Sequence, residues 1–216
     1  MKYKYEIIDE NHFDRRVVED TLEYQYWAIF KANLDHFFPK ILKVYKDNKI
    51  ISLAGVREAQ AGCFFLERYL EAPVEKVLSE KIGGQINRMN LLEVGNLVSL
   101  GYAGGLSMII VITIWSSSRN FQWVVCTVTR NLYAIFNKLG MEIIKIKPAK
   151  KEFLDIDEQN KWGNYYENEP VIIALNVENS KNILKNNYAS YYFPMEMFDF
   201  SLNQCAANKE NILCRK

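Results

Sequence analysis

The sequence has few of the residues that build metal sites and disulfide frameworks. Its 216 residues include four cysteines and two histidines. None of the cysteines has the CxxC spacing that is typical of zinc sites; they are Cys63, Cys126, Cys205 and Cys214. Only His12 and His36 could complete such a site. We therefore expect neither a metal ion nor a disulfide framework.

An excess of charge of one sign is also absent. Lys and Arg number 27 against 26 for Asp and Glu, which gives a formal net charge of +1. Proteins that bind nucleic acid or anionic membranes through their overall field carry a clear basic excess. No nucleic-acid partner is therefore expected.

Long apolar runs are missing as well. The longest near-continuous run, Leu106 to Trp115, contains Ser107 and Thr113 and is shorter than the roughly 20 residues that span a bilayer. At the N-terminus, two lysines are followed by acidic residues at positions 6, 9 and 10, which is unlike a secretory signal. The sequence predicts a cytoplasmic protein with reduced cysteines and no transmembrane segment.

The composition indicates a folded domain with a sizeable core. Hydrophobic residues make up 49% of the chain and charged residues 25%, as in ordinary globular proteins. One domain is expected over residues 1–177. Residues 178–216 are rich in Asn and Lys and are expected to form a C-terminal extension.

The stretch from Arg88 to Met141 has the pattern of a βαβα unit. Asn90 to Leu100 and Trp123 to Val128 read as buried strands, and Arg130 to Leu139 as an amphipathic helix. Leu106 to Trp115 is rich in β-branched residues, which by propensity alone favour a strand. Outside this unit, apolar patterns predict strands at 4–9, 41–46, 50–56, 141–146 and 170–177 and helices at 14–33 and 73–82.

Glu93 lies in the middle of an apolar strand. A carboxylate buried there is costly unless it is paired or lies in a cleft. On an ideal strand Glu93, Gly95, Leu97 and Ser99 share one face, while Val94, Asn96 and Val98 share the other. A bulge at Gly95 would alter this alternation.

Six segments in collinear order resemble the thermostable hemolysin family: GVREA (55–59), FFLERYLEAPVE (64–75), LLEVGNL (91–97), WVVCTVT (123–129), FNKLGM (136–141) and WGNYYE (162–167). That family is similar to the GNAT acyltransferases, and its LEVGNL strand to the ExSRF-type strand of acyl-homoserine-lactone synthases. The resemblance implies a single α/β domain with a mixed, mostly antiparallel twisted sheet flanked by helices. Its centre is a splayed parallel strand pair, and Leu106 to Ser118 is a helix.

The resemblance also implies transfer of an acyl group from a thioester to a small-molecule amine. Glu93 is the expected general base, and Asn96 is the second residue expected to be catalytic. Backbone groups of the strand end and the following Gly-rich loop are expected to hold the thioester; these residues are Val98, Ser99, Gly101, Ala103, Gly104 and Gly105. Arg57, Arg68 and Thr127 are expected to bind the substrate.

Two departures from the superfamily pattern affect the expected acyl donor and the expected general acid. No Lys or Arg occurs between Arg88 and Arg119, so a coenzyme A diphosphate lacks a nearby cation. The donor is therefore either acyl-CoA or the phosphopantetheine of an acyl carrier protein, a co-substrate and not a permanent cofactor. Phe136 replaces the tyrosine that many members place there, which leaves the general acid unassigned.

Simpler interpretations stand beside these. Glu93 could form an ion pair with Arg57, Arg68 or Arg88, and the glycines of residues 101–105 could simply make a turn. Trp162, Tyr165 and Tyr166 are expected to pack at a sheet edge. The chain could also be a membrane-active cytolytic protein, or a degenerate GNAT fold that binds acyl chains or a partner without catalysis.

Overall fold

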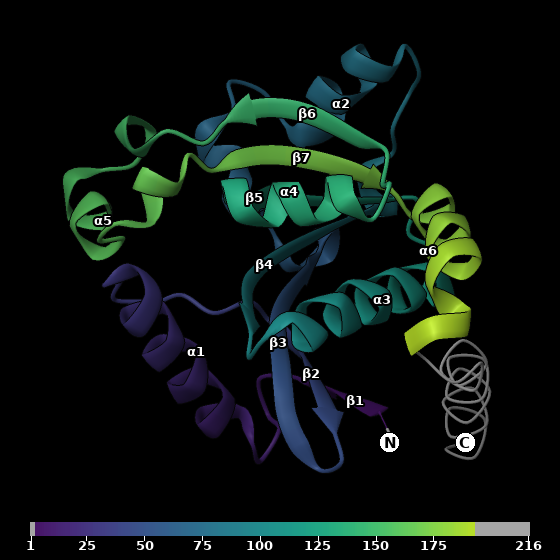
Figure 1. Cartoon of the computed structure of the whole chain (residues 1–216). Helices are drawn as coiled ribbons and strands as arrows, with labels where there is room; N and C mark the ends of the chain where they lie inside the picture. The colour runs from purple at the N-terminus through teal and green to yellow at the C-terminus, as the bar shows by residue number, and fades with distance from the viewer. Residues whose placement is uncertain (1–2, 193–216) are drawn as a thin grey trace, which may run out of the picture.

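The computed structural model of the chain describes residues 3–192, except for the side chains of residues 102 and 188–192. A seven-stranded sheet runs through the molecule in the order β1-β2-β3-β4-β5-β7-β6 (Figure 1). The strands are β1 (Tyr3–Ile8), β2 (Lys40–Lys46), β3 (Lys49–Glu58), β4 (Leu91–Ser99), β5 (Trp123–Val128), β6 (Ile143–Pro148) and β7 (Val171–Asn176). The helices are α1 (Arg15–Phe30), α2 (Val74–Ile82), α3 (Tyr102–Ser118), α4 (Arg130–Lys138), α5 (Ile156–Lys161) and α6 (Val177–Tyr192).

Two of the predicted strands, at 41–46 and 50–56, form an antiparallel hairpin. β2 and β3 pair on either side of Asp47 and Asn48, whose φ values of 49° and 65° are positive. Asn and Asp tolerate this conformation better than most residues, and it gives a tight turn whose twist suits a hairpin. β1 pairs with β2, and β3 with β4, also in antiparallel fashion.

The parallel pair at the centre is forked, as predicted. β4 and β5 pair from Leu91 opposite Trp123 to Val94 opposite Cys126, and the pairing ends there. β5 continues along β7 as far as Val128 opposite Val171. The second half of β4 therefore diverges from β5 and opens the sheet at this point.

A bulge lies in β4 directly after the fork. Between the pairs Gly55–Gly95 and Leu53–Val98, two residues of β4 oppose one of β3, and Asn96 has a φ of 45°. Consequently Leu97 packs with the core under α3, and Val98 packs with the core under α1. The simple alternation predicted for this strand is correct up to Gly95 and wrong after it, because the extra residue exchanges the faces.

Helices cover both faces of the sheet (Figure 1). One face packs against α3 and α4, and α6 lies against α3. The other face packs against α1 at one end and against α2 and the 3-10 helix η2 (Phe65–Tyr69) at the other. The family resemblance, not propensity, was right about α3, which is apolar on all sides because it is enclosed between the sheet and α6. It begins at Tyr102, so Gly104 and Gly105 lie in its first turn.

The boundary predicted after residue 177 falls at the junction of β7 and α6. α6 is tied to the domain through Val177 and Leu184, which are buried. Residues 193–216 of the predicted extension lie outside the described residues, and the division of the chain remains a prediction. None of the helices between residues 3 and 192 is long and apolar enough to cross a membrane.

Candidate functional site

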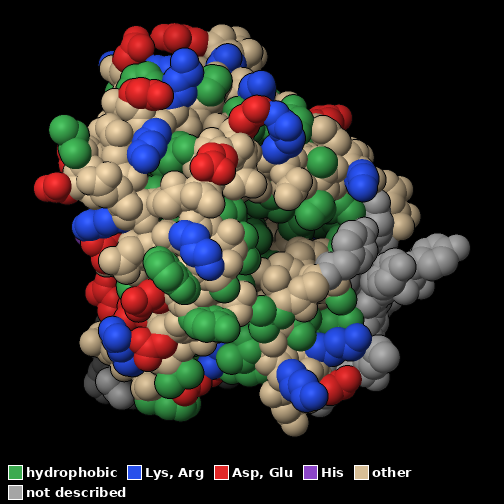
Figure 2. All heavy atoms as spheres, turned by 60° about the vertical axis from the view of Figure 1, so that its left-hand side comes forward, with side chains coloured by type: hydrophobic (Ala, Val, Ile, Leu, Met, Phe, Trp, Pro, Cys, Tyr) green, Lys and Arg blue, Asp and Glu red, His purple; other side chains and the backbone are tan. Residues whose placement is uncertain are grey.

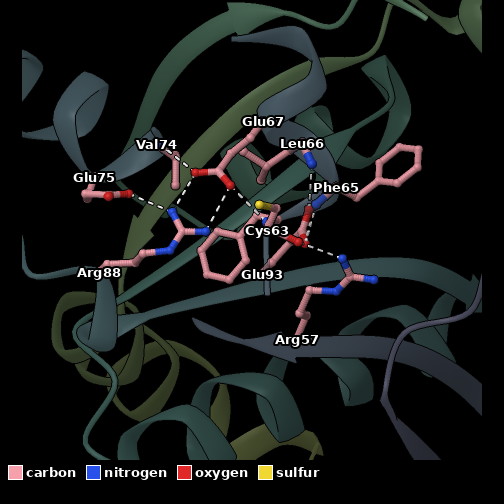
Figure 3. Close-up of polar contacts among 10 residues, drawn as sticks. Arg57, Cys63, Phe65, Leu66, Glu67, Val74, Glu75, Arg88 and Glu93 are labelled. Atoms are coloured by element: carbon pink, nitrogen blue, oxygen red, sulfur yellow. Dashed lines mark hydrogen bonds and ion pairs between the residues drawn. The ribbon is translucent and has the colours of Figure 1, made fainter. Parts of the chain in front are cut away.

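The Glu93 carboxylate is buried in the centre of the molecule and is held by backbone amides. Its side chain is 2% exposed. Oε2 accepts a hydrogen bond from the Phe65 N–H at 2.9 Å, and Oε1 accepts one from the Leu66 N–H at 2.8 Å (Figure 3). Each oxygen retains a lone pair for a second donor. The carboxylate is thus fixed in position and still able to accept a proton.

The three arginines considered as ion-pair partners are engaged elsewhere. Arg88 binds Glu67 and Glu75, Arg68 binds Glu158, and Arg57 donates from Nη1 to the Cys63 carbonyl oxygen at 2.7 Å. The structure thus provides backbone donors for Glu93 where the simpler interpretation expected a salt bridge.

Burial raises the pKa of Glu93 to about 7, although the Leu66 and Phe65 amides and the positive charge of Arg57 act in the opposite direction. Burial disfavours the charged form of a carboxyl group, while donors and cations favour it. A general base works best when its pKa lies near the operating pH. Glu93 therefore has the protonation behaviour expected of a base near neutral pH.

A network around Glu67 fixes the amides that hold Glu93 (Figure 3). Glu67 accepts hydrogen bonds from the Phe64 N–H at 2.9 Å and the Val74 N–H at 3.0 Å. Arg88 contacts both of its oxygens, at 2.6 and 2.9 Å, and also reaches Glu75 at 2.8 Å. This network ties η2 to the start of α2, so the Phe65 and Leu66 amides are preorganised toward Glu93.

Phe38 closes the other side of the site. A Cβ on Gly55 would lie 2.7 Å from the Phe38 Cβ, and one on Gly95 would lie 2.5 Å from the Phe38 Cζ. Both glycines are therefore needed for the ring to lie on the two strands. Asn96 Oδ1 accepts a hydrogen bond from the Phe38 N–H at 3.3 Å, and the Arg57 guanidinium lies 5.1 Å from the centre of the Phe38 ring.

A cavity of about 180 Å³ begins at Glu93 and continues through the fork between β4 and β5. On the side of α1 and η2 its walls are aromatic: Tyr26, Phe38, Phe65, Tyr69, Trp162 and Tyr165. On the side of α3 and α4 they are mainly aliphatic: Ile109, Ile112, Leu132, Phe136, Met141 and Leu175. Figure 2 shows a hollow surrounded by hydrophobic side chains on the face turned forward.

The structure brings some of the sequence-predicted residues together. Glu93, Asn96, Arg57 and Thr127 all line the cavity. Asn96 also holds the loop that carries Phe38, because its Oδ1 accepts a hydrogen bond from the Phe38 N–H.

The other predicted residues do not line the cavity. Val98 is buried beneath α1, and its carbonyl oxygen accepts a hydrogen bond from Ser52 Oγ at 2.6 Å. Ser99 Oγ donates to the Gly101 carbonyl oxygen. A Cβ on Gly104 would lie 2.2 Å from the Ile51 carbonyl oxygen, so this glycine serves close helix packing. Ala103 and Gly105 lie in the same helix turn, and Arg68 is bound to Glu158.

Sequence reasoning missed several aromatic residues of the site. Trp162 and Tyr165 were expected at a sheet edge and instead line the cavity, together with Tyr26 from α1. Burial raises the pKa of Tyr26, and a backbone hydrogen bond from Leu97 opposes this. The bulge considered at Gly95 was the available signal for the Leu97 backbone, because a bulge leaves an extra residue of the strand unpaired.

Comparison with known proteins supports the predicted fold and family. The AHL synthase LasI has a TM-score of 0.58 at 12% identity, over 86% of this chain and 95% of that chain. FeeM, an N-acyl amino acid synthase from uncultured soil microbes, has a TM-score of 0.57 at 11% identity, over 91% and 97%. BjaI, a CoA-dependent acyl-homoserine lactone synthase, has a TM-score of 0.54 at 9% identity, over 89% and 91%.

At these identities the likeness concerns the fold, and the predicted GNAT-like architecture is confirmed. Among curated proteins, no sequence matches the chain. The sequence profile described as "Thermostable hemolysin" matches residues 8–181, most of the chain. The chain therefore belongs to the thermostable hemolysin family.

Proposed function

We propose that the protein is an acyltransferase that moves an acyl group from a thioester to an amine. The observation that carries the proposal is the position of Glu93, a buried carboxylate with a pKa of about 7 in the wall of the cavity that passes through the fork. A base beside an apolar pocket is what aminolysis of an acyl thioester needs, because the amine must lose a proton before it can attack.

The proposed reaction uses Glu93 first. Its carboxylate takes one proton from the substrate ammonium, and the free amine attacks the thioester carbonyl carbon. The C–N bond forms and the C–S bond breaks. The nitrogen loses a second proton, the leaving thiolate gains one, and Glu93 returns its proton to solvent. The product is an amide and a free thiol.

The Leu97 amide is the candidate donor for the oxyanion of this step. Leu97 and Tyr26 both line the cavity, a backbone hydrogen bond from Leu97 lowers the pKa of Tyr26, and a preorganised N–H in a water-poor site stabilises developing negative charge. This places the proposed donor one residue before Val98, which the sequence had favoured.

The aliphatic half of the cavity is the proposed acyl-chain site. An apolar cavity of about 150 Å³ holds a benzene molecule. Both halves of the cavity together measure about 180 Å³, so the aliphatic half has room for only a short segment of an acyl chain. Widening of the pocket on binding would admit longer chains. The donor that brings the chain is an acyl carrier protein or acyl-CoA, with its phosphate near the first turn of α3, where Gly101 has a φ of 100°.

Purified protein supplied with octanoyl-CoA, or with octanoyl-acyl carrier protein, and a pool of amines tests the proposal. Mass spectrometry should detect N-octanoyl products with at least one donor, and Glu93→Gln should reduce their rate of formation by about 10²-fold or more. Preference for the carrier protein is expected because no Lys or Arg lies between Arg88 and Arg119. Wild-type protein that binds octanoyl thioesters but forms no amide would instead support a binding protein without catalysis.

One observation favours a second candidate, action at a membrane surface. Hydrophobic side chains on and beside α1 are exposed: Phe13, Val17, Tyr24, Trp27 and Ile29. Aromatic residues of this kind favour membrane interfaces. Cosedimentation with phosphatidylcholine vesicles, compared between wild type and Trp27→Ser, tests it, and equal recovery of both proteins in the supernatant would reject it.

A further inference from the structure

The cavity contains an arginine that the protein itself does not fully use. Arg57 donates from Nη1 to the Cys63 carbonyl oxygen at 2.7 Å. Its Nε is buried and has no hydrogen-bond partner among the described residues. An unsatisfied buried donor is costly, and guanidinium nitrogens Nε and Nη2 together form an edge that binds a carboxylate through two parallel hydrogen bonds.

The surroundings of Arg57 hold the guanidinium but provide no acceptor for this edge among the described residues. The group lies over the Phe38 ring at 5.1 Å, and Phe38 is pressed onto Gly55 and Gly95. Contact with a ring face stabilises the cation but provides no acceptor for an in-plane N–H. The protein therefore orients the plane of Arg57 without satisfying its Nε.

The cavity wall carries one acidic and one basic side chain close together, an arrangement that suits a zwitterionic substrate. Arg57 lies directly opposite Glu93 on neighbouring strands, and both line the cavity. Opposite residues in an antiparallel pair have Cβ atoms about 5 Å apart. A substrate that places a cation at Glu93 and an anion at Arg57 must therefore carry the two groups only a few bonds apart.

We propose that the acceptor is an α-amino acid, whose carboxylate binds the Nε–Nη2 edge of Arg57 and whose ammonium group lies at Glu93. This inference rests on the proposed acyl transfer and specifies its acceptor. The acyl group goes to the amino nitrogen as described above, the carboxylate is unchanged, and the product is an N-acyl amino acid. A simple amine lacks the group that would satisfy Arg57.

The test compares amino acids with the amines obtained by removing their carboxyl group. Wild type receives octanoyl-acyl carrier protein or octanoyl-CoA with tyrosine against tyramine, and with leucine against isoamylamine, and amide products are quantified. Loss of a hydrogen-bonded charge pair lowers binding roughly 10- to 100-fold, so the amino acid should be preferred by that ratio. Arg57→Gln should reduce the ratio at least tenfold, and Arg16→Gln, a change at an exposed arginine paired with Asp20, should leave it unchanged.

The outcomes separate this inference from the proposed function. Equal use of tyramine and tyrosine by wild type, or an unchanged ratio in Arg57→Gln, overturns the amino-acid acceptor while acyl transfer stands. If no amide forms with any acceptor, the acyltransferase proposal fails, and thermal melts in the presence of each amino acid then decide the role of Arg57. Stabilisation of wild type but not of Arg57→Gln by an amino acid supports the site, and no stabilisation of either overturns it.

Discussion

Arg57 and Glu93 lie opposite each other on β3 and β4, yet each is bound to a backbone group of the segment between the two strands. Arg57 donates to the Cys63 carbonyl oxygen and Glu93 accepts from Phe65 and Leu66. A direct ion pair would hold the pKa of Glu93 low. With the separate backbone partners, burial is the dominant influence and the pKa is about 7, so both side chains remain available to a ligand.

Replacement of Glu93 by Gln should remove activity at a moderate cost in stability. Loss of a general base lowers the rate by about 10²-fold or more. Gln has a single acceptor oxygen, so its NH2 group would face one of the two amides that now donate to Glu93. We expect a net destabilisation below about 3 kcal/mol, because removal of the buried charge offsets part of the loss. Urea unfolding beside the amide-formation assay measures both, and a folded variant with full activity would exclude Glu93 as the base.

The free energy of unfolding should decrease as the pH rises, because of the raised pKa of Glu93. Its pKa rises from 4.5 to about 7 on folding, so the folded state binds the proton more tightly. Protonation of Glu93 contributes about 3 kcal/mol to the free energy of unfolding. This contribution is fully present below pH 4.5 and is lost as the pH rises to about 7. The difference in unfolding free energy between wild type and Glu93→Gln, measured from pH 4 to 8.5, isolates this contribution. A difference that does not vary with pH would contradict the raised pKa.

Activity should increase with pH over the range in which the contribution of Glu93 to stability decreases. Only the carboxylate form of Glu93 accepts a proton, so kcat/KM should rise about tenfold per pH unit below 7 and level off above it. The profile of the purified enzyme between pH 5 and 8.5 measures this. A midpoint near 4.5 would show that Glu93 titrates as an ordinary exposed carboxyl group.

Arg88 should act on the site through the η2 segment. Arg88→Gln removes its hydrogen bonds to Glu67 and Glu75 and leaves two largely buried carboxylates near each other. We expect a loss of about 1–3 kcal/mol in unfolding free energy and a change in the midpoint of the pH–activity profile, because the Phe65 and Leu66 amides become less firmly placed. Arg16→Gln, which disrupts only an exposed pair, should cost less than about 0.5 kcal/mol. An unchanged midpoint in Arg88→Gln would limit Arg88 to a purely structural role.

Local patterns in the sequence identified most of the fold. The hairpin at Asp47 and Asn48, the strand Trp123–Val128 and the helix that begins at Arg130 were all predictable, because turn residues and apolar periods act over a few positions. The helical state of Ile109–Ile114 was not predictable from propensity. These β-branched residues form a helix because the sheet and α6 enclose them, and tertiary packing outweighs a weak local preference.

The candidate site was harder to predict, because it is built from residues that lie far apart in the sequence. Glu93 was conspicuous because a carboxylate in an apolar strand requires an explanation. Its partners at Phe65 and Leu66 come from a 3-10 helix that no periodic pattern indicated. The role of Asn96 was hidden because it depends on a positive φ at the bulge and on Phe38, which reaches the strand from another part of the chain.

Two neighbouring glycines of α3 should respond differently to the same substitution. In Gly104→Ala the new Cβ would lie 2.2 Å from the Ile51 carbonyl oxygen, a backbone atom, whereas in Gly105→Ala the nearest atom is Ser99 Oγ at 3.5 Å. The first change must push α3 away from β3, and overpacking of this kind costs about 1–3 kcal/mol. The second should be neutral or stabilise by up to about 1 kcal/mol, because Ala favours a helix over Gly. Urea unfolding of both variants measures the difference. Equal stability of the two would show that Gly104 is not needed for packing and would restore it as a candidate contact for the thioester phosphate.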